Sequence, residues 1–384
     1  MKRLLRILFG PGSSDFLSSL AAVMIGLLAG LLIMLISNPE QAWRAFWVIL
    51  TSGFSDMRNV GQVLYFATPI IMTGLSVGFA NRTGLFNIGA SGQFILGAYV
   101  AILTVIRNAT LPGALPWVLA LLAATLAGAV WGAIPGILKA WRNVNEVIAG
   151  IMMNYIGMYL VNYMIVQTVY DRLRNQTQRI PSAVALPKAG MDQIFRSGNS
   201  VSSANSGFII AAITAVVLYI ILERTRFGYE LKACGFNREA ARYAGINEGR
   251  SIILSMMIAG ALAGLGGGLL YLAGSGKSID VVDVLAAEGF AGIPVALLGL
   301  NNPIGIIFSG ILIAHLTVGG FNMQLYNFVP QVIEIITAVI IYFSAFALLL
   351  KAFMQRYSGS DREEIAQEDD VQMTLLPRKE MKSE

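Results

Sequence analysis

The stretch ERTRFGYELKACGFNREAARYAGINEGR, residues 223–250, decides how the rest of this chain must be arranged. It carries at least eight charged side chains and separates two long apolar runs. The chain as a whole is 56% hydrophobic and only 13% charged, so such a stretch must lie in water beside a membrane domain. Its position predicts a surface that is available to a soluble partner.

The order of residues within this stretch predicts a short helix. Gly228 is expected to break the preceding apolar helix, and Leu231 to Ala233 to form a helical turn. Asn237 is a good N-cap, and Gly245 can close the following helix in the left-handed conformation. We therefore predict a helix of about two turns between two membrane spans.

Composition places the chain among membrane proteins. Its 384 residues have a mean hydropathy of +0.67, and apolar runs of about twenty residues recur along the whole length. The net charge of +5 would suggest a nucleic-acid partner for a soluble domain. Here the basic residues lie mainly in loops and report membrane orientation, so no nucleic-acid partner is expected. The single cysteine, Cys234, excludes an internal disulfide and a cysteine metal site.

The apolar runs predict an all-α, polytopic membrane protein with about ten transmembrane helices and cytoplasmic N- and C-termini. The predicted spans are residues 16–37, 60–80, 86–106, 116–138, 146–167, 207–223, 251–273, 286–300, 304–320 and 329–350. Alternation from a cytoplasmic start places the loop 224–250 inside, as the distribution of basic residues requires. The loop 168–206 falls outside although it is rich in Arg and Lys, and docking of a partner is one explanation of its charge. Residues 355–384 are charged, so a disordered cytoplasmic tail is expected.

Two further patterns concern packing and the membrane surface. The segment from Glu40 to Met57 contains two tryptophans and is expected to form an interfacial helix. Glycines recur at helical spacing in three spans, where they are expected to let helix backbones approach closely. These glycines are Gly26 and Gly30; Gly128, Gly132 and Gly136; and Gly260, Gly264 and Gly268.

The charged stretch also carries an ordered motif, RTxxGxxLKAxGxNxxAARYAGI, at Arg224–Ile246. This motif resembles the cytoplasmic coupling loop of permease subunits in bacterial ABC importers of the branched-chain amino acid, ribose and nucleoside group. The alternative is a solvated basic loop, although charge alone does not require this spacing of Gly, Asn and Ala. The resemblance implies that ten residues couple the chain to an ATPase: Gly228, Gly235, Asn237, Arg238, Glu239, Ala240, Ala241, Arg242, Tyr243 and Gly245.

A second motif, NRTGLFNIGASGQ at Asn81–Gln93, links two predicted spans. Asn87 is expected to cap the following helix, on which Gly89, Gln93 and Gly97 share a face. Its second half resembles the FNIGxxGQ signature of the same permeases, in which the position of Ser91 is often acidic. A polar helix start at membrane depth lines a wet cavity or pairs with a neighbouring helix, and both readings stay open for Asn87 and Gln93.

A third motif, NEVIAGIMMNYIGMYLVNY at Asn145–Tyr163, resembles the corresponding span of nucleoside permeases. Its tyrosines and amides fall on one stripe, where rings could stack on a nucleobase and amides could read its edge. An aromatic belt at the membrane surface is the alternative. Glu288 precedes a run that resembles the GFxGIxVALLGxNxP pattern of the family. The candidate pathway residues are Asn87, Gln93, Asn145, Glu146, Asn154, Tyr155, Tyr159, Asn162 and Glu288.

The chain has no GxxxxGK[ST] sequence, so it cannot hold ATP phosphates with a P-loop of its own. The resemblance therefore implies a transport subunit rather than an enzyme, with residues 1–354 as its transmembrane permease domain. No cofactor is expected on this chain, and ATP and Mg²⁺ are expected on a separate ABC ATPase subunit. The other implied partners are a second permease subunit, identical or related, and an extracytoplasmic substrate-binding protein or lipoprotein, in the bacterial cytoplasmic membrane.

Nucleosides are the expected small-molecule substrate. Ribose-like sugars and branched-chain amino acids are alternatives, because the coupling loop is shared and does not specify a substrate. An ion-coupled secondary transporter would need a proton or sodium relay, for which Glu288, Glu334 and His315 are sparse candidates. His315 is expected to be a packed core residue. A membrane scaffold without transport would use the loop and leave the Asn and Tyr stripe without a purpose.

Overall fold

The computed structural model describes residues 11–274 and 276–329, together with 331–332, 334–336, 338–339 and 342–343. The predicted disordered tail, 355–384, and much of the predicted last span, 329–350, lie outside the described residues. Within them the protein is almost wholly helical, and the all-α, multi-pass class is confirmed. The long helices are α2 (Pro11–Ser37), α4 (Met57–Arg82), α5 (Ala90–Arg107), α6 (Leu115–Arg142), α7 (Glu146–Thr168), α9 (Gly207–Arg224), α12 (Glu248–Tyr271) and α14 (Pro303–Met323).

Seven helices of the described part are long and apolar enough to cross a membrane, so the predicted count of about ten is not confirmed. The predicted span 286–300 is wrong as a membrane crossing. It forms α13 (Ala287–Leu298), whose 12 residues extend only about 18 Å, roughly half of what a membrane requires. Helix α13 contains Pro294 and has Gly299 as its C-cap, and the chain then turns back at once into α14.

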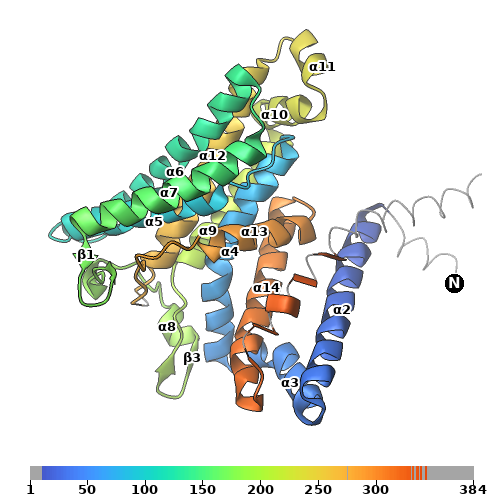
Figure 1. Cartoon of the computed structure of the whole chain (residues 1–384), viewed down its shortest axis with the longest axis vertical. Helices are drawn as coiled ribbons and strands as arrows, with labels where there is room; N and C mark the ends of the chain where they lie inside the picture. Colours follow the sequence, from blue (N-terminus) through green and yellow to red (C-terminus); the bar gives the residue numbers. More distant parts are fainter. Residues whose placement is uncertain are drawn as a thin grey trace, which may run out of the picture.

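The centre of the bundle is built on close contact between glycines, as predicted. A Cβ on Gly128 would lie 2.2 Å from the carbonyl oxygen of Gly260, and one on Gly97 would lie 2.4 Å from Cα of Gly264. Only glycine permits this approach between α12 and its neighbours α5 and α6. In Figure 1 these helices and α7 form one tilted group, and α4 runs between them and the pair α13 and α14.

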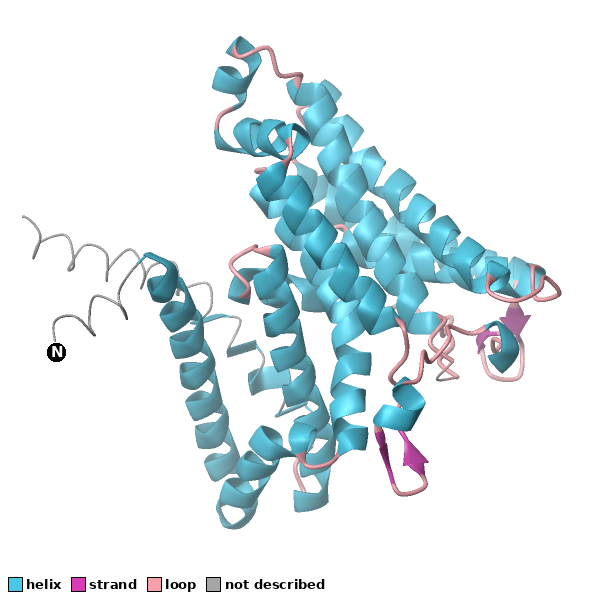
Figure 2. Cartoon of the chain, turned by 180° about the vertical axis from the view of Figure 1, so that it is seen from behind, coloured by secondary structure: helices cyan, strands magenta, loops and turns pink. Residues whose placement is uncertain are grey.

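The short elements lie at the two ends of the molecule (Figures 1 and 2). Helices α10 (Arg226–Phe236) and α11 (Arg238–Tyr243) occupy one end. The opposite end carries α3 (Pro39–Thr51) and the hairpin of β3 (Arg196–Ser197) with β4 (Ser200–Val201). The hairpin of β1 (Tyr170–Asp171) with β2 (Gln176–Thr177) follows the end of α7, at the left of Figure 1. The remaining short elements are α8 (Met191–Ile194) and the 3-10 turns Ser52–Phe54, Ser182–Val184 and Gln324–Tyr326.

Helix α3 is amphipathic, as the interfacial prediction requires. Its face toward the bundle is fully buried at Ala42, Ala45 and Ile49. Trp43 and Trp47 on the other side remain 64% and 58% exposed. Such rings favour the headgroup level of a bilayer, so the prediction of an interfacial helix stands.

Candidate functional site

The predicted coupling loop begins with a break at Thr225, whose backbone is extended (φ −117°, ψ 153°). The Thr225 hydroxyl accepts a hydrogen bond from the backbone N–H of Gly228 at 3.1 Å and so caps α10. The prediction of a break at Gly228 is therefore wrong, and the predicted turn at Leu231–Ala233 belongs to an 11-residue helix. Gly228 is needed for contact, since a Cβ there would lie 2.1 Å from the carbonyl oxygen of Ile221.

Helix α11 has the caps that its sequence predicts. The Asn237 side-chain oxygen accepts from the backbone N–H of Ala240 at 3.0 Å. Gly245 adopts the left-handed conformation (φ 81°), and the N–H of Ile246 donates back to the carbonyl of Ala241. The six-residue helix is therefore fixed at both ends, and its length fits the predicted helix of about two turns.

The side chains of α11 divide into an inner and an outer set. Ala241 is buried at 4% exposure, whereas Ala240, Glu239 and Arg242 are exposed and Arg238 is half-buried. Two large rings beside this helix are almost fully exposed, Phe236 at 89% and Tyr243 at 92%. Exposed rings at the end of a rigid helix are typical of a surface that a partner covers. Phe236 was missed in the sequence because its motif position is not among the fixed letters.

Helix α10 is held against the turn between α4 and α5. A Cβ on Gly235 would lie 2.6 Å from the backbone nitrogen of Gly84, which itself has a φ of 72°. Gly235, one of the predicted coupling residues, is the next-to-last residue of α10 and makes this contact. Next to it, the carboxylate of Glu223 in α9 forms ion pairs with Arg82 at 2.5 Å and with Lys232 at 2.9 Å. The coupling loop is thus joined to the α4–α5 turn by backbone contact, and Glu223 links Lys232 of α10 to Arg82 at the end of α4.

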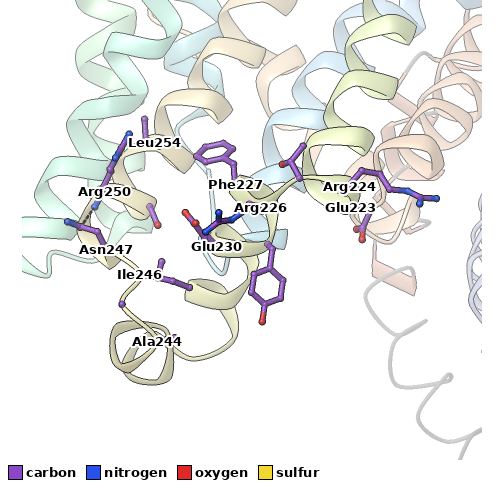
Figure 3. Close-up of a pocket in the computed structure, with 14 residues that line it drawn as sticks. Glu223, Arg224, Arg226, Phe227, Glu230, Ala244, Ile246, Asn247, Arg250 and Leu254 are labelled. Atoms are coloured by element: carbon purple, nitrogen blue, oxygen red, sulfur yellow. Dashed lines mark hydrogen bonds between the residues drawn. The ribbon is translucent and has the colours of Figure 1, made fainter.

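A cleft of about 910 Å³ separates α10 from the start of α12. Figure 3 shows Phe227, Glu230, Ile246 and Arg250 around it, with α11 on its far side. Asn247 at its rim accepts from the backbone N–H of Arg250 at 2.9 Å and caps α12. The cleft therefore leaves α11 standing away from the bundle, where a partner could reach it.

Asn87 and Gln93 form a closed amide pair in the turn before α5. The Asn87 amide donates to the Gln93 side-chain oxygen at 2.7 Å, and the Gln93 amide donates back at 3.1 Å. Ser76 of α4 accepts from Asn87 and donates to the carbonyl of Ala259 at 2.6 Å. Both amides are buried, so this conformation favours helix packing over pathway lining. The predicted capping by Asn87 is wrong, because Gly89 holds the N-cap position of α5.

Asn154 of α7 supplies the cap that α5 lacks in its own sequence. Its side-chain oxygen accepts from the backbone N–H of Gly92 at 2.8 Å, and its amide donates to the carbonyl of Ile88 at 2.9 Å. The side chain is 1% exposed. We predicted a pathway role for Asn154, but in this conformation it fixes α5 to α7. No local pattern could have predicted this, because the two groups lie 62 residues apart in the chain.

Asn145 and Glu146 also have structural partners. Asn145 caps α7 by accepting from the backbone N–H of Val147 at 2.8 Å, and Glu146 pairs with Lys139 at 2.9 Å. Both lie at the start of α7, roughly 24 Å along that helix from Asn162. The structure therefore does not bring them together with the other pathway candidates.

Two of the remaining candidates, Asn162 and Glu288, each contact the segment that leads the chain into α13. Asn162 of α7 donates to the carbonyl of Val282 at 3.0 Å and to the carboxylate of Asp283 at 3.1 Å. Glu288, in the first turn of α13, pairs with Lys277 at 2.7 Å. We call this region, Lys277 to Glu288 together with Asn162, the α13 entrance. Tyr155 and Tyr159, on the same helix as Asn162, are 48% and 55% exposed.

The α13 entrance lies level with the middle of α4, not with either of its ends. The Thr73 hydroxyl donates to the carbonyl of Glu288 at 3.0 Å, and Thr73 lies roughly 14 Å before the end of α4. On the α5 side, Ser91 donates to the carbonyl of Ala286 at 2.9 Å, and a Cβ on Gly289 would lie 2.3 Å from Cα of Ser91. A half-length helix that begins at mid-depth, beside irregular backbone and exposed polar groups, is typical of transporter substrate sites.

Two candidates for an ion relay do not form one. His315 is buried, with its Nε2 3.0 Å from the carbonyl of Leu50 and its ring stacked on Phe54 at 4.6 Å, as a packed core residue should be. Glu334 has an exposed side chain. Cys234 is buried at 5% exposure and packs inside the coupling loop. The described residues contain no group of three or more His, Cys, Asp or Glu that could hold a metal ion.

Residues 59–345 match the model of one protein family, described as the branched-chain amino acid transport system / permease component. The chain is 38% identical to the guanosine ABC transporter permease protein NupP of Bacillus subtilis, over 89% of this chain and 96% of that protein. It is 35% identical to the nucleoside ABC transporter permease protein NupB of Lactococcus lactis, over 88% and 92% of the two chains. It is also 34% identical to the glucose ABC transporter permease protein TsgB13 of Haloferax volcanii, over 89% and 88%.

A second permease from each of the first two organisms is also similar to this chain. These are the guanosine permease protein NupQ and the nucleoside permease protein NupC, each 28% identical, over 71% and 67% of this chain. No solved structure matches it.

Proposed function

This chain belongs to the family of permease components named for branched-chain amino acid transport, and from that premise we propose that it is the membrane permease subunit of an ATP-driven nucleoside importer. One observation carries the proposal. The similarity to permeases named for guanosine and for nucleosides extends over nearly the whole of both chains, at 38% and 35% identity. It therefore includes the spans around the α13 entrance as well as the coupling loop.

We place the ATPase at α11. Its exposed Ala240 and Tyr243 would lie in a groove of the ATPase subunit, and Arg242 would make charged contacts at the groove rim. ATP and Mg²⁺ belong to that subunit, because this chain has no P-loop sequence. The buried Ala241 fixes α11 to its own protein, so the helix would move with α10 as a rigid body.

Closure of the ATPase would then reach the α13 entrance through contacts already described. The movement of α10 passes to the α4–α5 turn at Gly235 and Gly84, and through Glu223 to Arg82. That turn leads into α5, whose Ser91 touches Ala286 and Gly289. Alternating access follows as a shift between inward- and outward-open populations.

At the entrance, the proposed substrate contacts are complementary to a nucleoside. Asp283 and Glu288 could accept hydrogen bonds from ribose hydroxyls, and the Tyr155 and Tyr159 rings offer faces for the base. Asn162 holds the entrance in place by its bonds to Val282 and Asp283. A polar group at membrane depth is costly unless it lines a wet pathway, which favours this use of the carboxylates.

The assembly we propose has two permeases, an ATPase and an extracytoplasmic binding protein in a bacterial cytoplasmic membrane. The two permeases named for guanosine in Bacillus subtilis, and the two named for nucleosides in Lactococcus lactis, favour a pair of related permeases over two identical ones. Residues of the partner permease would face α7 or the α13 entrance and complete the pathway.

Reconstitution tests the proposal directly. The chain would be purified with its ATPase, second permease and binding protein, placed in proteoliposomes, and supplied with radiolabelled adenosine or guanosine. We expect ATP-dependent uptake that unlabelled nucleosides compete for and that glucose and leucine do not. Competition by glucose would favour the sugar alternative that the Haloferax relative represents. Uptake driven by an ion gradient without ATP would contradict the proposed class.

A further inference from the structure

The loop 169–206 is rich in basic residues, although it lies on the side of the membrane where few basic residues are expected. It has five basic side chains, Arg172, Arg174, Arg179, Lys188 and Arg196, against two acidic ones. All five are exposed, and none forms an ion pair with a described residue. The β3–β4 hairpin lies at the end opposite α10 and α11, and the β1–β2 hairpin follows the end of α7 that points away from them (Figure 1), whereas basic residues gather on the cytoplasmic side of membrane proteins. This exception requires a reason.

The turn between β1 and β2 presents two of these residues on a rigid frame. Arg172, Leu173 and Arg174 form its outermost part, and Leu173 is 98% exposed. We call these three residues the hairpin tip. The carboxylate of Asp171 accepts from the backbone N–H of Leu173 at 3.0 Å, and Asn175 adopts a left-handed conformation with φ 54°. The backbone of the tip is thus ordered although its side chains contact little.

The same hairpin is hydrogen-bonded directly to the extended first part of the α13 entrance. The backbone N–H of Thr177 donates to Ile279 at 2.9 Å, and that of Val281 donates to Asn175 at 2.9 Å. The Asn175 side chain also donates to the carbonyl of Val281 at 3.0 Å. Asp283 follows two residues later, so a force on the tip acts on the α13 entrance.

We propose that the hairpin tip is a docking point for an acidic surface of the extracytoplasmic substrate-binding protein, and that β1–β2 passes this contact to the α13 entrance. The inference rests on the proposed function, which requires such a partner. Two arginines flanking an exposed leucine match the residues that dominate protein interfaces, and opposite charge guides a soluble partner to them.

A membrane contact fits the tip less well. Rings of Trp and Tyr anchor proteins at the headgroup level, and this protein presents Trp43 and Trp47 on α3. The hairpin tip has none, and the Tyr170 hydroxyl beside it is engaged with Asn175 at 2.7 Å. The strong negative surface potential of membranes belongs to the cytoplasmic leaflet, on the other side.

The first experiment measures binding of the purified soluble domain of the nucleoside-binding protein from the same system to the permease–ATPase assembly in nanodiscs. We expect the double variant Arg172→Glu/Arg174→Glu to bind at least about tenfold more weakly at low salt and to lose most of its salt dependence. The matched control, Arg58→Glu/Lys188→Glu, makes the same charge change at exposed positions of the same end and should change binding less than about threefold. Equal loss in both variants would show a general field effect and overturn the docking site.

A second variant, Asn175→Gly, separates docking from transmission. Glycine keeps the left-handed backbone and removes the side-chain bonds to Tyr170 and Val281. We expect binding within about twofold of wild type and stimulation of ATP hydrolysis by the loaded binding protein reduced about threefold or more. Unchanged stimulation would refute the transmission. Thermal melting of each variant within a few degrees of wild type establishes that it is folded.

The outcomes also separate this inference from the proposed function. A wild-type assembly that takes up nucleosides and binds the protein, together with a tip variant that binds equally well, refutes the docking site alone. A wild-type assembly that does neither refutes the proposed function, and the inference with it. A defect of the tip variant that appears only in nanodiscs with anionic lipid, at unchanged affinity for the binding protein, would assign the tip to the membrane and overturn the proposal.

Discussion

Replacing Gly235 with alanine separates the coupling loop from the α4–α5 turn without removing any functional side chain. The added Cβ would lie 2.6 Å from the backbone nitrogen of Gly84 and 2.6 Å from the carbonyl carbon of Thr83. Ordinary contacts between such atoms are about 3.5–4.0 Å, so the two backbones must separate by roughly 1 Å. Both neighbours are main-chain atoms and cannot rotate away.

The magnitude follows from two opposing effects. Overpacking of this kind typically costs about 1–3 kcal/mol, whereas alanine stabilises a helix interior by about 1 kcal/mol relative to glycine. The stabilisation by alanine acts on α10 in both the docked and the undocked loop, but the steric cost arises only where α10 contacts the turn. We therefore expect stability to fall by no more than about 2 kcal/mol, while the equilibrium between docked and undocked loop shifts by roughly 5- to 150-fold.

The assay compares ATP hydrolysis with and without loaded binding protein in nanodiscs. Gly235→Ala is expected to keep basal hydrolysis and lose most of the stimulation. Gly249→Ala is the matched control, because Gly249 is helical and its nearest neighbours to a Cβ are 3.7 and 3.9 Å away. Full stimulation in Gly235→Ala, with the variant assembled and folded, would refute the proposed route from α10 to α5.

Three further substitutions test other parts of the structure. Asn154→Ala leaves two buried backbone groups without partners, so the free energy of unfolding should fall by about 2–4 kcal/mol. The measurement is the melting temperature, and an unchanged value would mean that water replaces the cap. Glu288→Gln breaks a partly exposed pair with Lys277, so stability should change by less than about 1 kcal/mol while the KM for nucleoside uptake rises several-fold; an unchanged KM would remove Glu288 from the pathway. Ala240→Glu should abolish stimulated ATP hydrolysis at an unchanged melting temperature, whereas Ala241→Glu would also destabilise the loop because Ala241 is buried; normal stimulation in Ala240→Glu would contradict docking at α11.

The sequence alone was sufficient for features whose physical cause is local. Apolar runs determined most of the spans, and Asn237 and Gly245 determined the ends of α11 because caps act over three or four residues. Glycine spacing likewise predicted close backbone approach in the spans that form α6 and α12, but not that they meet each other. Each of these signals is carried by neighbouring residues on one helix or turn.

The tertiary structure decided everything that depends on a partner distant in the chain. Asn87, Gln93 and Asn154 resembled pathway residues because a polar side chain in an apolar run needs a partner, and the run does not identify it. The fold supplies those partners within the protein, whereas Asn162 and Glu288 contact the segment that leads into a helix too short to span. The predicted bounds 286–300 nearly match α13, but hydropathy did not show that this segment begins at mid-depth and does not cross the membrane. Hydropathy records how apolar a segment is, and the depth at which it begins is set by packing against α4 and α5.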